Sequence, residues 1–220
     1  MKKLILTIAF LTSFVSAAYS QGSMGFTVNL ADIDTSLSDD IDNNGSTDTT
    51  KDISNEVVFG SIFLERELGN GVVVGIDFIP FEAEFESRST SQSSIKEKGS
   101  STTTGTNKGT ADVSKHLTLY VQPTRELDNG SKVFATLGIV RADVESKVQS
   151  ISSTNKTVDQ SLDGFKFGVG MKRDLGTNGF FKLELNRTDY DDISATTSNS
   201  TKVTADIDTT VLGLSIGRSF

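Results

Sequence analysis

The segment DIDNNGSTD, residues 40–48, has the residue types and spacing of a calcium-binding loop. Its pattern, D-x-D-x-N-G-x-x-D, matches the first part of a twelve-residue loop in which side-chain and carbonyl oxygens surround the ion and a glycine, here Gly45, makes the sharp turn. The twelfth position holds Lys51 instead of a bidentate carboxylate, so a solvated acidic loop is the alternative to a weak site. The expected ligands are the side chains of Asp40, Asp42, Asn44 and Asp48 and the carbonyl of Ser46.

The single histidine, His116, is the other candidate for chemistry, because hydroxyl groups lie near it at Ser114 and Thr118. A base within hydrogen-bond reach of a hydroxyl is the arrangement that nucleophilic catalysis requires. No partner motif accompanies this histidine, so we interpret it as a satisfied interior polar group and expect no enzymatic activity. The chain contains no cysteine, which excludes disulfides, cysteine nucleophiles and thiolate metal sites.

The beginning of the chain has the layout of a secretory signal peptide. Two lysines precede an apolar stretch over residues 4–15, and small residues follow, with cleavage expected after Ala17 or Ser20. The stretch is too short for a transmembrane helix, which needs about 20 residues. We therefore expect residues 1–20 to be removed and residues 21–220 to form one domain. A lipoprotein anchor is excluded by the absence of cysteine, and the formal net charge of −8 argues against nucleic acid as a partner.

Alternation of apolar and polar residues is the dominant pattern in the rest of the chain. Phe165, Phe167 and Val169, for example, alternate with glycine and lysine, and this period of two residues predicts strands. Each run is long enough for the ~9–11 tilted residues that cross a membrane as a barrel strand. No later apolar run approaches the length of a spanning helix, so a membrane location requires a closed barrel. The eight runs cover residues 22–35, 53–67, 72–87, 112–126, 131–148, 161–174, 179–190 and 206–220.

Short and long connections alternate between these runs. The three short connections carry the related sequences RELGNG, RELDNG and RDLGTNG, and Asn-Gly favours a hairpin because both residues tolerate positive φ. The connection over residues 88–111 is rich in serine and threonine and is not expected to bury a core of its own. Tight turns at one end and long loops at the other predict an all-β fold, an eight-stranded antiparallel up-and-down transmembrane β-barrel. A soluble eight-stranded sandwich is the alternative. The four long connections are residues 36–52, 88–111, 149–160 and 191–205.

Taken together, the signal peptide, the eight runs, the four long loops and the terminal Phe220 resemble the small eight-stranded outer-membrane barrels of the OmpA-transmembrane and opacity type. The resemblance covers the whole mature chain and implies location in the outer membrane of a Gram-negative cell. It implies a structural or surface-interaction role through the extracellular loops. A porin-like narrow channel for small solutes is the alternative, and a lipid-modifying enzyme is third.

The same resemblance implies two partners, outer-membrane lipid and the barrel-assembly machinery, which would read Phe220 at the end of the last strand. We expect no cofactor other than the weak calcium ion considered for the first extracellular loop, and the resemblance identifies no extracellular ligand.

Strand phases predict which charged residues face the interior. A barrel of eight strands is only wide enough for its own side chains, and buried charges need partners, so we expect a lumen plugged by salt bridges. A bulge near residues 79–80 keeps Asp77 and the glutamates after it inside. The phase of the run over residues 131–148 is left open at its lower end. The predicted interior set is Lys166, Lys172, Lys182, Arg141 and, less firmly placed, Lys147, with Asp77, Glu82, Glu84, Glu86, Asp143, Glu145 and Glu184.

Alternation along each strand places the arginine that begins each short connection on the same side as the lipid-facing residues. Arg66, Arg125 and Arg173 are therefore expected at the inner rim of the barrel, pointing outward. A long side chain at that level can reach the phosphates of the headgroups.

The calcium hypothesis makes a direct prediction. Isothermal titration of the protein with calcium should give heat of binding, and Asp42→Ala should remove it because one of the carboxylate ligands is lost. A wild-type protein that gives no heat would contradict the hypothesis.

Overall fold

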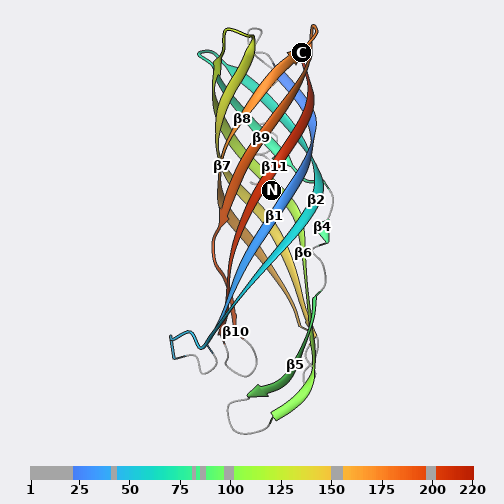
Figure 1. Ribbon diagram of the computed structural model, residues 1–220, viewed down its shortest axis with the longest axis vertical. Helices are drawn as coiled ribbons and strands as arrows, with labels where there is room; N and C mark the ends of the chain where they lie inside the picture. The colour runs from blue at the N-terminus through green and yellow to red at the C-terminus, as the bar shows by residue number, and fades with distance from the viewer. Residues whose placement is uncertain are drawn as a thin grey trace, which may run out of the picture.

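The chain folds into a closed antiparallel sheet in which the first and last strands pair with each other (Figure 1). The computed structural model describes residues 22–40, 44–80, 83–84, 88–96, 102–149, 156–196 and 202–220. The predicted signal peptide lies outside these residues. No helix in the described part of the chain is long and apolar enough to cross a membrane.

Eight strands form the ring, in the order β1-β2-β3-β6-β7-β8-β9-β11, and β11 returns to β1. Three short strands extend it, because β4 and β5 continue the line of β3 along β6, and β10 continues β9 along β11. This arrangement confirms the predicted fold, and each of the eight predicted runs corresponds to a ring strand, although in the run over residues 72–87 that strand ends at Phe78. The ring strands are β1 (Gly22–Asp40), β2 (Thr49–Leu68), β3 (Val72–Phe78), β6 (Thr102–Glu126), β7 (Ser131–Gln149), β8 (Lys156–Leu175), β9 (Gly179–Tyr190) and β11 (Lys202–Ser219), and the short strands are β4 (Ala83–Glu84), β5 (Arg88–Lys96) and β10 (Ile193–Thr196).

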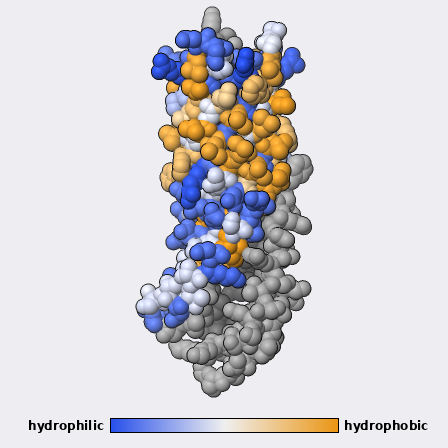
Figure 2. Space-filling view, viewed as in Figure 1, coloured by the Kyte–Doolittle hydropathy of each residue, from blue (hydrophilic) through white to orange (hydrophobic). Residues whose placement is uncertain are grey.

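Many large apolar side chains point outward, which is the reverse of a soluble protein. Leu137, Phe165 and Ile216 are each more than half exposed, whereas their neighbours in sequence face the interior. Figure 2 shows that such side chains form a belt nearer the end of the barrel that carries the tight turns, with polar surface on both sides of it. A sheet closed on itself leaves no edge, so its backbone groups are paired within the wall. The outward belt is therefore the lipid-facing surface.

The three tight turns place their arginines as predicted but use their glycines differently. Asn70 and Gly71 both have a φ of 74°, as expected for Asn-Gly. In the second turn only Gly130 has positive φ, and in the third the residue with positive φ is Gly176, so the Asn-Gly expectation is wrong there. The third loop holds an additional residue, and its reversal falls on the glycine that follows the strand. The parity of strands β2, β6 and β8 directs Arg66, Arg125 and Arg173 outward.

The strands continue well beyond the belt into regions predicted to be loops. The prediction for residues 88–111 is wrong in this respect, because β5 pairs with β6 and forms a hairpin extension of the wall. Backbone pairing needs no apolar core when it continues an existing ladder, and threonine suits extended backbone, so a polar composition does not prevent it. In Figure 1 these extensions project from the end opposite the tight turns.

The predicted bulge is present, and β6 takes part in it. Strand β3 ends before residues 79–80, and the Ile79 amide donates a hydrogen bond of 3.1 Å to the carbonyl of His116. On β6 the register against β7 shifts between Ser114 and Leu117, and Lys115 has a φ of 51°. An extra residue in one strand produces this local shift. The side chains of Glu82, Glu84 and Glu86 lie outside the described residues.

Two predicted interior charges on β7 are in fact outward. Leu137 and Ile139 face lipid, and β7 keeps that phase, so Arg141 and Asp143 also point away from the lumen. Arg141 instead forms an ion pair of 3.6 Å with Asp163 on the outer surface. The side chains of Glu145 and Lys147 are outside the described residues.

The first turn allows a test of this geometry. Gly71→Ala should destabilise the barrel by about 1–2 kcal/mol, because alanine disfavours positive φ and its Cβ would lie 2.7 Å from the carbonyl oxygen of Thr124. Gly69→Ala is the matched control, since no atom lies within 4 Å of a Cβ placed there. Urea unfolding in detergent micelles measures both variants, and equal stability would contradict the assigned turn.

Candidate functional site in the barrel lumen

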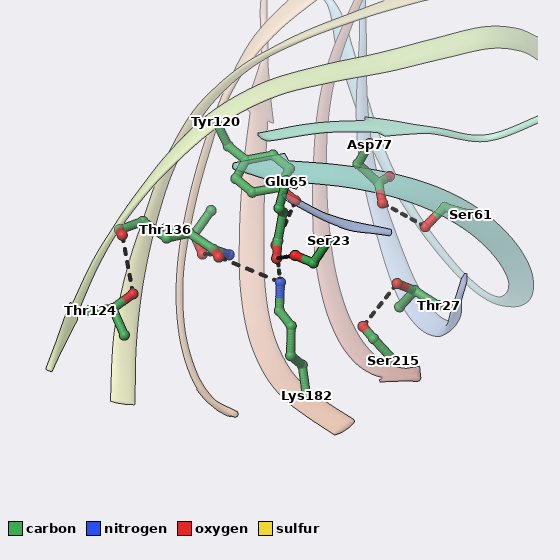
Figure 3. A network of polar contacts seen from close by, with 11 residues as sticks. Ser23, Thr27, Ser61, Glu65, Asp77, Tyr120, Thr124, Thr136, Lys182 and Ser215 are labelled. Atoms are coloured by element: carbon green, nitrogen blue, oxygen red, sulfur yellow. Dashed lines mark hydrogen bonds and ion pairs between the residues drawn. The ribbon is translucent and has the colours of Figure 1, made fainter. Parts of the chain in front are cut away.

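An ion pair between Lys182 and Glu65 occupies the centre of the lumen. Lys182 points inward from β9 and Glu65 from β2, and their side chains are only 5% and 3% exposed. The Tyr120 hydroxyl donates a hydrogen bond of 2.8 Å to Oε1 of Glu65, and Lys182 also donates to Oε1 of Gln122 at 3.4 Å. Figure 3 shows Lys182, Glu65 and Tyr120 converging from different strands of the barrel. A buried pair needs such additional hydrogen bonds to offset the loss of hydration.

Aromatic rings enclose this ion pair. The Lys182 Nζ lies 4.9 Å from the ring centroid of Phe63 and 5.2 Å from that of Phe134. Phe180 is fully buried beside Phe63, and the Nζ of Lys172 lies 3.8 Å above its ring. A cation over an aromatic face is attracted by the negative face of the ring, and the attraction grows when water is excluded. Rings and charges therefore lie together at this level of the lumen.

Glycines on neighbouring strands make room for these rings. A Cβ on Gly25 would clash with Phe63, one on Gly170 with Phe134, and one on Gly217 with Phe180. Each of these three rings therefore lies over a glycine on the adjacent strand. In this way a narrow barrel accommodates aromatic side chains without widening.

A second layer of polar residues lies next to the central pair. Asn29 donates to the hydroxyl of Ser61 at 3.2 Å, and Ser61 donates to Asp77 at 2.9 Å. A cavity of about 30 Å³ is bordered by these side chains together with Lys166 and Glu184. Its volume suits about one water molecule. Oε1 of Glu184 is buried and has no hydrogen-bond partner in the described part of the chain.

The histidine lies in the lumen beyond these layers and is not assembled into a catalytic pair. His116 Nε2 is 3.0 Å from the hydroxyl of Tyr190, and Nδ1 has no partner among the described residues. The hydroxyl of Thr118 is also buried without such a partner, so it is not hydrogen-bonded to the histidine. The side chain of Ser114 lies outside the described residues. The inward position of His116 agrees with the sequence analysis.

Outward-facing ion pairs lie where the apolar belt ends. Arg187 contacts Asp189 at 3.1 Å and Asp208 at 2.7 Å, while Lys115 contacts Asp143 at 3.2 Å. These side chains are largely exposed, so each pair contributes little to stability. Their position marks the extracellular limit of the lipid-facing surface.

The predicted calcium loop is described in part. Both carboxylate oxygens of Asp40 accept backbone hydrogen bonds, at 3.0 Å from Asn44 and 2.8 Å from Gly45. The side chain of Asn44 accepts a hydrogen bond of 2.8 Å from the amide of Ser46. Asp42 lies outside the described residues, and Asp48 comes directly before β2. The calcium site stays a prediction.

Sequence analysis located part of the central cluster. The inward positions of Asp77, Lys166, Lys172, Lys182 and Glu184 follow from strand parity. Glu65 was missed, although in SIFLEREL it shares a parity with Ser61 and Phe63, opposite to the outward Ile62. That alternation was enough to predict that Glu65 faces the lumen. The interior rings were missed because an aromatic residue in a membrane strand is first assigned to lipid.

An antiparallel barrel with a lipid-facing apolar belt and a polar interior defines an integral outer-membrane protein. The chain belongs to the outer membrane protein beta-barrel domain family, whose family model matches residues 4–220. It is located in the outer membrane of a Gram-negative cell.

Several solved structures are similar to this chain at low sequence identity. The outer membrane protein OprG from Pseudomonas aeruginosa is 16% identical with a TM-score of 0.55, and the match covers 90% of this chain and 96% of that one. Ail, the attachment invasion locus protein of Yersinia pestis, is 12% identical with a TM-score of 0.44, over 90% and 99% of the two chains. The outer membrane protease OmpT from Escherichia coli is 8% identical with a TM-score of 0.48, over 93% and 98%. No curated protein matches the sequence significantly.

The central ion pair gives a stability prediction. Lys182→Met should destabilise the barrel by about 3–5 kcal/mol, because Glu65 is left buried without its counter-charge. Combining Lys182→Met with Glu65→Gln should recover most of this loss, since no uncompensated charge then remains. Urea unfolding in micelles measures the two variants, and a double variant no more stable than Lys182→Met would contradict the assigned pairing.

Proposed function

We propose that this protein is a closed barrel with a structural and surface-interaction role, and that it presents its extracellular strands and loops while its lumen stays shut. The observation that carries the proposal is the Lys182–Glu65 pair within its aromatic shell. A conducting path through this level would have to separate two buried opposite charges, and each would then be left without compensation.

The size of the interior space supports a closed lumen. The cavity beside the central pair has a volume of about 30 Å³, so it suits isolated water and not a file of solutes. Gln122 and Thr136 close the wall on one side of it through a hydrogen bond of 3.0 Å. Thr27 and Ser215 do so on another through one of 2.9 Å. These bonds tie strands together across the lumenal surface and leave few side chains free to move aside.

The extended strands support a role at the cell surface. Leu30 is the last strongly exposed apolar residue of β1, yet the strand continues for ten residues to Asp40. At about 3.3 Å per residue this extension is roughly 30 Å long. Figure 2 shows polar surface beyond the apolar belt in this direction. A paired, polar extension of that length holds the connecting loops away from the bilayer, where they are accessible to other molecules.

A narrow channel is the second candidate, and one observation favours it. His116 Nδ1 and Glu184 Oε1 are buried polar atoms without a partner in the described residues, and such atoms usually bind ordered water. Water bound at these two positions would lie along such a channel. Enzymatic activity is not part of the proposal, because the hydrogen bond of His116 is made with the phenol hydroxyl of Tyr190 and not with the hydroxyl of Thr118, the nucleophile candidate whose side chain is described.

Planar-bilayer recording distinguishes a closed barrel from a channel. The wild-type protein should give no stepwise conductance in concentrated potassium chloride, whereas Lys182→Ala, which shortens the side chain and leaves a gap beside Glu65, should give small steps. Lys115→Ala is the control, since that lysine is 78% exposed on the outer surface and should leave the barrel closed. Regular steps from the wild-type protein would support the channel and overturn the proposal.

A further inference from the structure

The lipid-facing wall has an open hollow on the side formed by β6 to β11. Its volume is about 710 Å³, within the range of about 300–1,000 Å³ typical of sites for small organic molecules. The side chains that line it are almost entirely apolar, with one charged exception, Arg125. Other outward residues around it are Pro123, Ala135, Val169, Met171 and Leu185.

Strand register explains why the wall is hollowed here. Ala135, Val169, Leu185 and Leu212 are successive cross-strand neighbours, so they form one row on the outer face, and Val133, Met171 and Leu183 form the row nearer the tight turns. The first row begins with the smallest side chain, that of Ala135. Pro123 lies beside it on β6 and has no N–H to donate to the ladder. Within this described stretch, β6 and β7 pair at Val121 with Leu137 and again at Thr124 with Phe134, with the pairing interrupted between them.

Two arginines flank the hollow at its periplasmic side. Arg125 pairs in register with Val133 on β7, and Arg173 pairs with Ser131, two residues away on the same strand. Their strands are separated only by β7, so their backbones are about two strand spacings, or roughly 10 Å, apart across the sheet. Both side chains are exposed and outward, and neither forms an ion pair or hydrogen bond with a described residue. Two guanidinium groups that reach toward each other from this distance can share one anion.

We propose that this surface binds a phospholipid of the periplasmic leaflet, with its phosphate between Arg125 and Arg173 and an acyl chain lying in the hollow over Ala135. The surface matches such a lipid in both of its parts. The arginines lie at the level of the charged headgroup, and the apolar hollow lies deeper in the membrane, at the level of the acyl chains. Guanidinium groups suit phosphate because they donate parallel hydrogen bonds to its oxygens. The lipid would fill a surface defect that a flat wall does not have.

A second copy of the chain fits this surface less well. In a two-fold contact the same patch meets itself, so the arginines of both copies would approach one another. Like charges brought together at a partly desolvated contact oppose association, whereas a phosphate neutralises them. Charge complementarity therefore favours lipid as the occupant.

Native mass spectrometry of the folded protein, released from a neutral detergent and titrated with dioleoyl phosphatidylglycerol, tests the proposal. The wild-type barrel should retain one lipid, and Arg125→Gln with Arg173→Gln should weaken retention about tenfold, as expected for the loss of charge-assisted contacts. Ala135→Phe should weaken it as well by filling the hollow without altering charge. Dioleoylglycerol, which lacks the phosphate, should bind the wild-type protein as weakly as the lipid binds the double variant.

Matched controls separate this site from general adsorption of lipid. Arg218 is an outward arginine at the same rim, but it lies six residues, about 20 Å, from Leu212 along β11, so Arg218→Gln should not change retention. Val58→Phe places the same phenyl ring on β2, at a position 69% exposed and away from the hollow. Heat-modifiable migration on a gel verifies that each variant is folded. Equal lipid retention by all variants would overturn the proposal, and so would a wild-type dimer that Ala135→Phe dissociates.

Discussion

Each strand of this barrel lies between lipid on the outside and the lumen on the inside. Because successive side chains of a strand point to opposite faces, the two-residue period decides which of the two each side chain meets. A peptide group in hydrocarbon needs a hydrogen-bond partner, so the strands must be hydrogen-bonded to one another all round the wall. The register of this pairing then fixes which side chains face lipid and which face the lumen. Once Phe165 and Phe167 face lipid, Lys166 must face the lumen. The distribution of charge, the position of the arginines and the content of the interior all depend on this constraint.

The polar groups that this constraint places in the interior are compensated by one another. Lys182 and Glu65 neutralise each other, Tyr120 satisfies an oxygen of the carboxylate, and the rings of Phe63 and Phe134 exclude water from the pair. The result combines the polarity that a barrel interior must have with the packing of a protein core. Figure 3 shows that Glu65, Tyr120 and Lys182 come from strands far apart in sequence, so the network also ties the two sides of the barrel together.

The sequence was sufficient for the fold because the fold depends on periodicity and turn chemistry, and both are local. It was sufficient for Lys166, Lys172 and Lys182 for the same reason. It placed Arg141 wrongly because a charged residue was assumed to avoid the lipid side, whereas β7 rises above the belt at that point and water replaces lipid. The hairpin of β5 with β6 was missed because its serine and threonine residues carry no apolar alternation, and only the existing ladder of β6 makes pairing favourable. Which lysine meets which carboxylate depends on register across the barrel, and no local pattern encodes that.

The pairing of β1 with β11 has a kinetic consequence. Thr27 and Ser215 are hydrogen-bonded although 188 positions separate them, so the seam forms between segments made at opposite ends of synthesis. Contacts of such long range are slow to form, because the loop between them loses much entropy before any contact compensates for it. Until the last strand, β11, arrives, both β1 and β9 present an unpaired edge, the kind of surface that recruits other chains. The barrel is therefore safest when insertion and closure happen together, and an arrested chain that lacks only β11 would be more hazardous to the cell than one that has barely begun.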